Sequence, residues 1–85
     1  MSHDASSPKK LIYMANQIGK FFVAQKDQGK AVVGMATHLT KFWTPVMREK
    51  IILHLDQGGE GLDPLARQAV EKLKAGRPQK SELAS

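Results

Sequence analysis

The chain has 85 residues, a formal net charge of +5 and no cysteine. A chain of this length forms one domain at most, and it buries only about 60% of the surface that its unfolded form exposes. The absence of cysteine excludes disulfides and thiolate metal ligands, so a protein partner is the remaining source of extra stability. No apolar run approaches the roughly 20 residues that span a bilayer, and no signal-peptide segment begins the chain, so we expect a cytoplasmic protein that does not enter the membrane.

Helix signals divide the chain into four segments. Ser7, Thr44 and Asp63 each stand directly before a proline, the usual pairing of an N-cap with a first helical turn. Gly58 and Gly76 stand where helices would end. No segment alternates with the period of a strand. The predicted helices cover residues 8–25, 30–43, 45–57 and 64–75.

These segments predict the fold class and the domain organisation. We expect an all-α protein, a small bundle of about four short helices over residues 8–75. Residues 1–7 and the basic stretch 76–85 are polar, and we expect both to be disordered tails.

The first three predicted helices carry broad apolar surfaces. In the first, apolar side chains cover an arc of roughly 200°, about twice the width of the stripe on an ordinary surface helix. The second is similar, and apolar residues of the third point nearly all round. Only the fourth has a narrow stripe, and we expect its opposite face, with Arg67, Glu71, Lys72 and Lys74, to face water.

This excess of apolar surface predicts a docking surface for another chain. Three short helices carry more apolar arc than they can cover for one another. Aromatic residues, Met and Arg are enriched at the centres of interfaces. The predicted partner-binding residues are Phe21, Phe22, Phe42, Trp43, Met47 and Arg48. The alternative, that Phe42 and Trp43 are ordinary core residues on adjacent helix faces, stays open.

Motifs for catalysis or metal binding are missing from the sequence. His38 and His54 lack a partner at helical spacing, and His54 with Asp56 and Glu60 is the kind of trio that arises by chance. The glycine-rich segment 57–64 lacks the GxxxxGK[ST] pattern, so it is interpreted as a helix stop followed by a flexible turn. We therefore predict no catalytic, cofactor-binding or metal-binding residue in this chain.

Three segments of the chain occur together, in the same order and with similar spacing, in one known family. They are LIYMANQIGKFF (11–22), HLTKFWTPVMREKI (38–51) and HLDQGGEGLDPLARQAV (54–70). The cluster KFW-T-P-x-MR followed by GGxGLxPL is the most specific part, because its unusual residues are Trp, Pro and paired glycines. In these segments the chain resembles the delta subunit of soluble NAD-dependent formate dehydrogenases. The matching residues are Asn16, Gln17, Phe22, His38, Phe42, Trp43, Pro45, Met47, Arg48, Gly58, Gly59, Gly61, Leu62 and Pro64.

The resemblance implies a small helical accessory subunit of a cytoplasmic complex. This subunit itself is expected to bind no redox cofactor. In such a complex the alpha subunit carries the molybdenum cofactor and iron-sulfur clusters, the beta and gamma subunits pass electrons to NAD, and FMN is a further expected cofactor. No residue is carried over as catalytic. We expect the chain to dock on the alpha subunit and to stabilise it or assist its maturation with cofactor in place.

Two other classes of function compete with this interpretation. A pI near 9.8 and small size favour a nucleic-acid-binding module, but the basic residues are spread along the chain without an Arg-rich helix face. We therefore expect no nucleic-acid partner. A homodimeric regulator would bury the same aromatic residues against a second copy, and the isolated chain could dimerise in this way.

Overall fold

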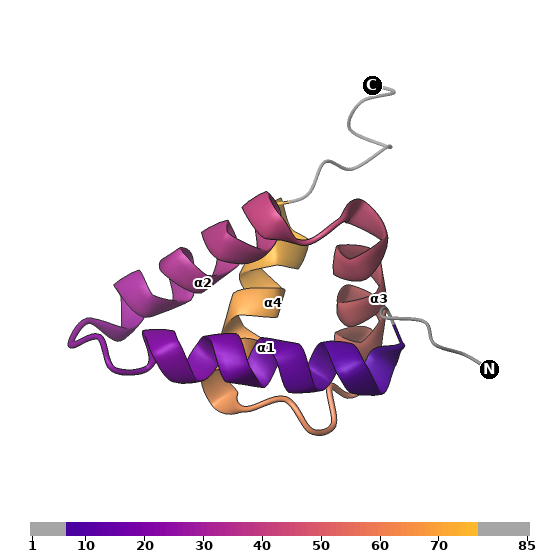
Figure 1. Cartoon of the computed structure of the whole chain (residues 1–85), viewed down its shortest axis with the longest axis horizontal. Coiled ribbons are helices and arrows are strands. Elements are labelled where there is room, and N and C mark those ends of the chain that lie inside the picture. Colours follow the sequence, from indigo (N-terminus) through magenta and orange to yellow (C-terminus); the bar gives the residue numbers. More distant parts are fainter. Residues whose placement is uncertain (1–6, 77–85) are drawn as a thin grey trace.

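The computed structural model describes residues 7–76, which form four helices (Figure 1). They are α1 Pro8–Phe22, α2 Gln28–Phe42, α3 Pro45–Asp56 and α4 Pro64–Gly76. No strand occurs within this range, so the predicted all-α bundle is confirmed. The largest difference from the predicted bounds is at the end of α1, which stops at Phe22 rather than at residue 25. Apart from Ser7 and Gly76, the two predicted tails lie outside the described residues.

Side-chain caps start three of the helices. The hydroxyl of Ser7 accepts a hydrogen bond from the backbone N–H of Lys10, and the hydroxyl of Thr44 accepts one from that of Met47 at 3.2 Å. At α2 the carboxylate of Asp27 accepts from the N–H of Lys30 at 3.2 Å. This cap explains why α2 begins at Gln28, two residues before the predicted start.

α4 is the helix on which the other three pack. It lies behind α1 and between α2 and α3, and it contacts all three (Figure 1). Its buried residues include the alanines 66 and 69, whose small side chains allow close approach of neighbouring helices. At Gly19 of α1, an added Cβ would lie 3.9 Å from the backbone nitrogen of Ala66, so α1 crosses α4 almost backbone to backbone.

One contiguous apolar core joins the four helices. Its largest fully buried side chains are those of Leu11, Met35, Leu39, Ile51 and Val70. Burying each large apolar side chain contributes about 1.5–3 kcal/mol to folding. Each of α1, α2 and α3 contributes only one face to this core. The remaining apolar residues of those three helices stay partly or fully exposed.

The loop between α3 and α4 is fixed by backbone conformation and by side chains from other parts of the fold. Gly58, Gly59 and Gly61 have positive φ angles of 119°, 64° and 92°, a region that L residues with a Cβ rarely adopt. The side chain of Asn16, on α1, makes two bonds to this loop. Its amide nitrogen donates to the carbonyl of Gly61 at 2.8 Å, and its amide oxygen accepts from the N–H of Asp63 at 2.9 Å.

Two further side chains hold the same loop. Arg67 donates to the carbonyls of Gly58 and Gly59 at 3.0 and 3.1 Å, and a ring nitrogen of His54 lies 2.8 Å from the carbonyl oxygen of Glu60. The expectation that Arg67 simply faces water is therefore wrong, since its half-buried guanidinium fastens the loop to α4. The predicted flexible turn is a segment tied to three helices.

Asn16→Ala tests the contribution of this loop attachment. The substitution removes two hydrogen bonds at once. We expect the free energy of unfolding to fall by about 1–2 kcal/mol, because a neutral hydrogen bond contributes about 0.5–1.5 kcal/mol. Urea denaturation followed by circular dichroism measures the change. The neighbouring variant Gln17→Ala, which loses one exposed bond to the hydroxyl of Tyr13, is the control and should change stability by less than about 0.5 kcal/mol. Equal effects of the two variants would contradict the assignment.

Candidate partner-binding surface

The six predicted partner-binding residues occupy different environments. Phe21 and Phe42 are 74% and 70% exposed, the two largest values among the exposed large hydrophobic residues of the described chain. Phe22 and Met47 are half-buried against the core. Trp43 is 5% exposed, and its side chain is part of the core. The alternative of an ordinary core residue thus holds for Trp43 and fails for Phe42.

Four aromatic rings form a continuous surface that we call the aromatic ridge, made of Phe21, Phe22, His38 and Phe42. The Phe21 and Phe22 rings meet edge to face with centroids 5.1 Å apart. Phe22 lies 6.2 Å from His38, and His38 lies 4.7 Å from Phe42. Such ring pairs contribute about 0.5–1.5 kcal/mol beyond the area that they bury. The ridge therefore joins the end of α1 to the end of α2.

Gly34 makes room for the centre of the aromatic ridge. A Cβ at this position would lie 2.9 Å from Cε1 of Phe22, closer than real Cβ contacts. The Phe22 ring thus lies directly on the bare backbone of α2. Gly34, His38 and Phe42 follow one another at intervals of four residues and so share one face of this helix.

Basic residues border the aromatic ridge. Lys20 and Lys41 are exposed and immediately precede the two exposed phenylalanines in the sequence. Both lie in the last turn of their helices, where a cation interacts favourably with the helix dipole. Each exposed phenylalanine thus has an exposed cation next to it in the chain.

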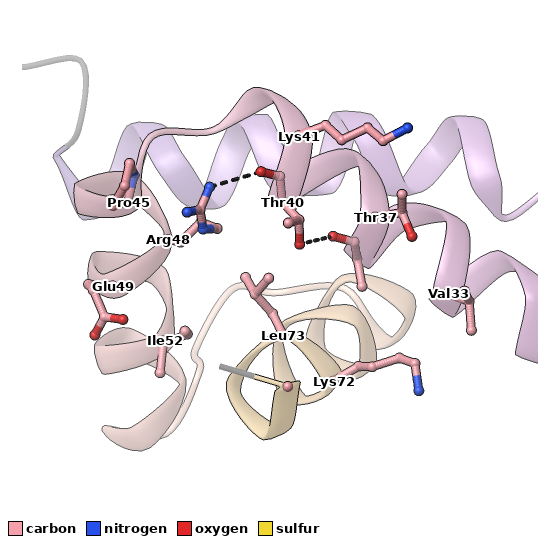
Figure 2. A pocket seen from close by; sticks show the side chains of 12 residues that line it. Val33, Thr37, Thr40, Lys41, Pro45, Arg48, Glu49, Ile52, Lys72 and Leu73 are labelled. Carbon is pink, nitrogen blue, oxygen red and sulfur yellow. Dashed lines mark hydrogen bonds between the residues drawn. The ribbon is translucent and has the colours of Figure 1, made fainter. Parts of the chain in front are cut away.

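Arg48 stabilises the bend between α2 and α3. Its guanidinium donates to the carbonyl of Thr40 at 3.0 Å (Figure 2). It also donates to the carbonyl of Trp43. The last carbonyls of a helix have no partner within the helix, and Arg48 satisfies two of them at the end of α2. Arg48 was predicted to contact a partner, and in the isolated chain its bonds are to its own backbone.

Within residues 7–76 no group of three metal-ligating side chains comes together. In the trio considered above, His54 contacts the backbone of Glu60, and Asp56 pairs with Lys74. Because the chain has no cysteine, its residues do not fit a cluster held by thiolates. Among the described helices, none has the length and hydrophobicity needed to cross a membrane.

Sequence reasoning missed one ring of the aromatic ridge and the glycine beneath it. His38 was considered as a metal ligand and as a residue that matches the family, but not as part of a partner-binding surface, and Gly34 was not examined. The signal for both was their spacing from Phe42, because residues four apart share a helix face. The contact with Phe22 could not be read in the same way, since it depends on how α1 crosses α2.

The fold and this surface define a small all-α protein that presents an aromatic ridge to solvent. Residues 10–70 match the family described as NADH-dependent formate dehydrogenase delta subunit, FdsD. The match covers most of the chain, and the chain belongs to this family. The three segments that carried the resemblance and the whole aromatic ridge lie within it, so the sequence-based identification is confirmed. Comparisons with curated proteins and with solved structures give no match.

Gly34→Ala tests the packing of the aromatic ridge. The new methyl group would displace the Phe22 ring from α2, so we expect the chemical shifts of the His38 ring protons to change. The gain of up to about 1 kcal/mol in helix propensity should be offset in part by this displacement. NMR spectra and thermal unfolding measure the two effects.

Gly19→Ala is the matched control for this prediction. It also adds a methyl group inside a helix, but its Cβ meets only ordinary contacts, the nearest being 3.6 Å from the sulfur of Met35. We expect this variant to keep the His38 shifts and to gain stability. Unchanged His38 shifts in Gly34→Ala would contradict the described packing.

Proposed function

We propose that this chain is a non-catalytic accessory subunit of a cytoplasmic NAD-dependent formate dehydrogenase complex. It docks on the molybdenum-containing alpha subunit through the aromatic ridge, and docking stabilises that subunit or assists its maturation with cofactor in place. Membership of the delta-subunit family supports a role beside other subunits. The observation that carries the proposal is the exposure of Phe21 and Phe42 on one continuous aromatic surface.

The predicted residues divide into two roles under this proposal. Phe21 and Phe42 make direct apolar contact with the partner, and half-buried Phe22 and His38 join them. Trp43, Met47 and Arg48 contribute indirectly. Trp43 and Met47 pack in or against the core, and Arg48 bonds to the backbone of the bend that follows Phe42. Aromatic anchors surrounded by polar residues are typical of interface centres.

The chemistry of the complex is proposed to lie on other subunits. The alpha subunit would carry the molybdenum cofactor and iron-sulfur clusters, and the beta and gamma subunits would pass electrons to NAD with FMN. The lack of cysteine in this chain supports that division, since thiolates are the usual ligands of iron-sulfur clusters. The chain's own contribution is then to binding and stability.

The energetics of docking on the aromatic ridge can be bounded. Burying one phenylalanine contributes about 1.5–3 kcal/mol, so the two exposed rings contribute about 3–6 kcal/mol together. Association costs about 4–15 kcal/mol in lost translational and rotational freedom. Even at the lowest cost and the highest gain the rings leave a surplus of only about 2 kcal/mol, so a stable complex needs further contacts. Lys20, next to Phe21 in the sequence, would orient the ridge against an acidic surface and increase the association rate.

The double variant Phe21→Ser/Phe42→Ser tests the docking role. We expect it to fold, because both side chains are exposed, and to bind the alpha subunit at least about a hundredfold more weakly, since about 3 kcal/mol or more is lost. To measure the binding, each form of the chain is expressed with a tag in its native cells, and the amount of alpha subunit that co-purifies with it is compared. Formate-dependent NAD reduction and the molybdenum content of the alpha subunit should fall as well.

The control is Val46→Ser/Leu53→Ser, which removes two apolar side chains that are 58% and 56% exposed on α3. It should co-purify as the unaltered chain does. Equal recovery of all three forms, or full activity and molybdenum content in cells lacking the chain, would refute the proposed function. The nucleic-acid alternative would be favoured instead if the chain bound nucleic acid with an affinity that fell by orders of magnitude between 50 and 200 mM salt.

A further inference from the structure

A second surface, which is recessed, lies on the side of α2 away from the aromatic ridge. This pocket, which we call the elbow pocket, has a volume of about 440 Å³ and lies between α2, α3 and the end of α4 (Figure 2). On α2 it is lined by residues at positions 33, 36, 37, 40 and 41, whereas the ridge lies on the face of positions 34, 38 and 42. The two surfaces therefore flank the buried face of the same helix.

The floor of the elbow pocket is largely apolar. Buried Ala36 of α2, Ile52 of α3 and Leu73 of α4 form it, and the more exposed Val33 lines the pocket together with Thr37 and Thr40. Its volume is within the range of about 300–1,000 Å³ that is typical of binding sites for small ligands and anchoring side chains. An aliphatic or aromatic side chain entering the pocket would therefore find apolar contacts from three helices.

The rim of the elbow pocket is positively charged. Lys41, Arg48 and Lys72 line it together with one acidic residue, Glu49, which has an interaction within the chain. Arg48 is committed to the carbonyls at the end of α2, whereas Lys41 and Lys72 are exposed. Figure 2 shows both lysine side chains extending outward at the edge of the pocket. Carboxylates placed beside a side chain in the pocket would be within reach of these two cations.

We infer that the elbow pocket binds an acidic segment of a partner subunit, which inserts one large apolar side chain between α2, α3 and α4 and places flanking carboxylates on Lys41 and Lys72. The inference rests on the proposed function, since the segment belongs to a subunit of the same complex. It supplies the further contact that the aromatic ridge alone does not provide. An apolar floor with two exposed lysines suits such a segment better than a phosphate backbone, which is bound by many cations in a row.

Zero-length cross-linking of the assembled complex tests this inference. A carbodiimide joins a lysine to a carboxylate only where the two are in direct contact. We expect Lys41 and Lys72 to be joined to Asp or Glu residues that neighbour a large apolar residue in another subunit. Mass spectrometry of the purified complex identifies the joined peptides. To recognise links between two copies of this chain, the complex is prepared from a mixture of ¹⁴N- and ¹⁵N-labelled chain.

The variant Lys41→Glu/Lys72→Glu adds a measure of affinity. Both side chains are exposed, so the fold should persist, as circular dichroism can verify. We expect binding to the other subunits to weaken at least about tenfold, because two attractive charges become repulsive. The matched control is Lys9→Glu/Lys10→Glu, which changes the net charge equally on exposed residues of the first turn of α1. This control should bind as the unaltered chain does.

Each other outcome overturns the inference in a recognisable way. Normal co-purification of Lys41→Glu/Lys72→Glu, with no link from Lys41 or Lys72 to another subunit, would reject the elbow pocket and leave the proposed function standing. Links between two copies of this chain would assign the pocket to a homodimer. A loss of binding that nuclease treatment reproduces would assign it to nucleic acid. If the unaltered chain does not co-purify with the complex at all, the proposed function fails and the inference fails with it.

Discussion

The fold depends on the close packing of three helices around α4, whose buried face is narrow and contains two alanines. Small side chains bring the neighbouring backbones near, as at Gly19, where α1 crosses above Ala66. A narrow central helix can cover only one face of each neighbour. Apolar residues elsewhere on α1, α2 and α3 are therefore left on the surface, even though the core itself is contiguous. The exposed aromatic ridge follows from this geometry.

Two surfaces of different character result on the flanks of α2. One is the aromatic ridge, with rings in contact from Phe21 to Phe42. The other is a pocket with an apolar floor and a basic rim. Lys41 lies between them, next to Phe42 in the sequence and on the edge of the pocket. Under the two proposals made above, α2 is the helix whose surroundings matter most for association. Its remaining face is already used by the core.

Much of the fold could be predicted from local signals, while the fate of single side chains could not. Ser7 and Thr44 before proline fixed helix starts correctly, because capping is decided by the residues next to it. Phe42 is the last residue of α2 and Trp43 is its extended C-cap, so one side chain can be buried while the other is exposed. Which one is buried depends on where α3 and α4 pack, and no local pattern contains that information. The prediction that Arg67 faces water failed for the same reason. Its partners are carbonyls of a loop whose path depends on three glycines. The elbow pocket likewise exists only where three separate helices meet.

The attachment of Asn16 to the α3–α4 loop has a consequence for the order in which the protein is made. Its two hydrogen bonds join positions 45 and 47 residues apart, so α1 cannot be fastened in place until the ribosome has released the chain beyond Asp63. The four rings of the aromatic ridge, in contrast, all come from residues 21 to 42. Contacts of short sequence separation form sooner than those that close long loops. The four rings can therefore come together early in a nascent chain, whereas the attachment of α1 to the α3–α4 loop is a late step of folding.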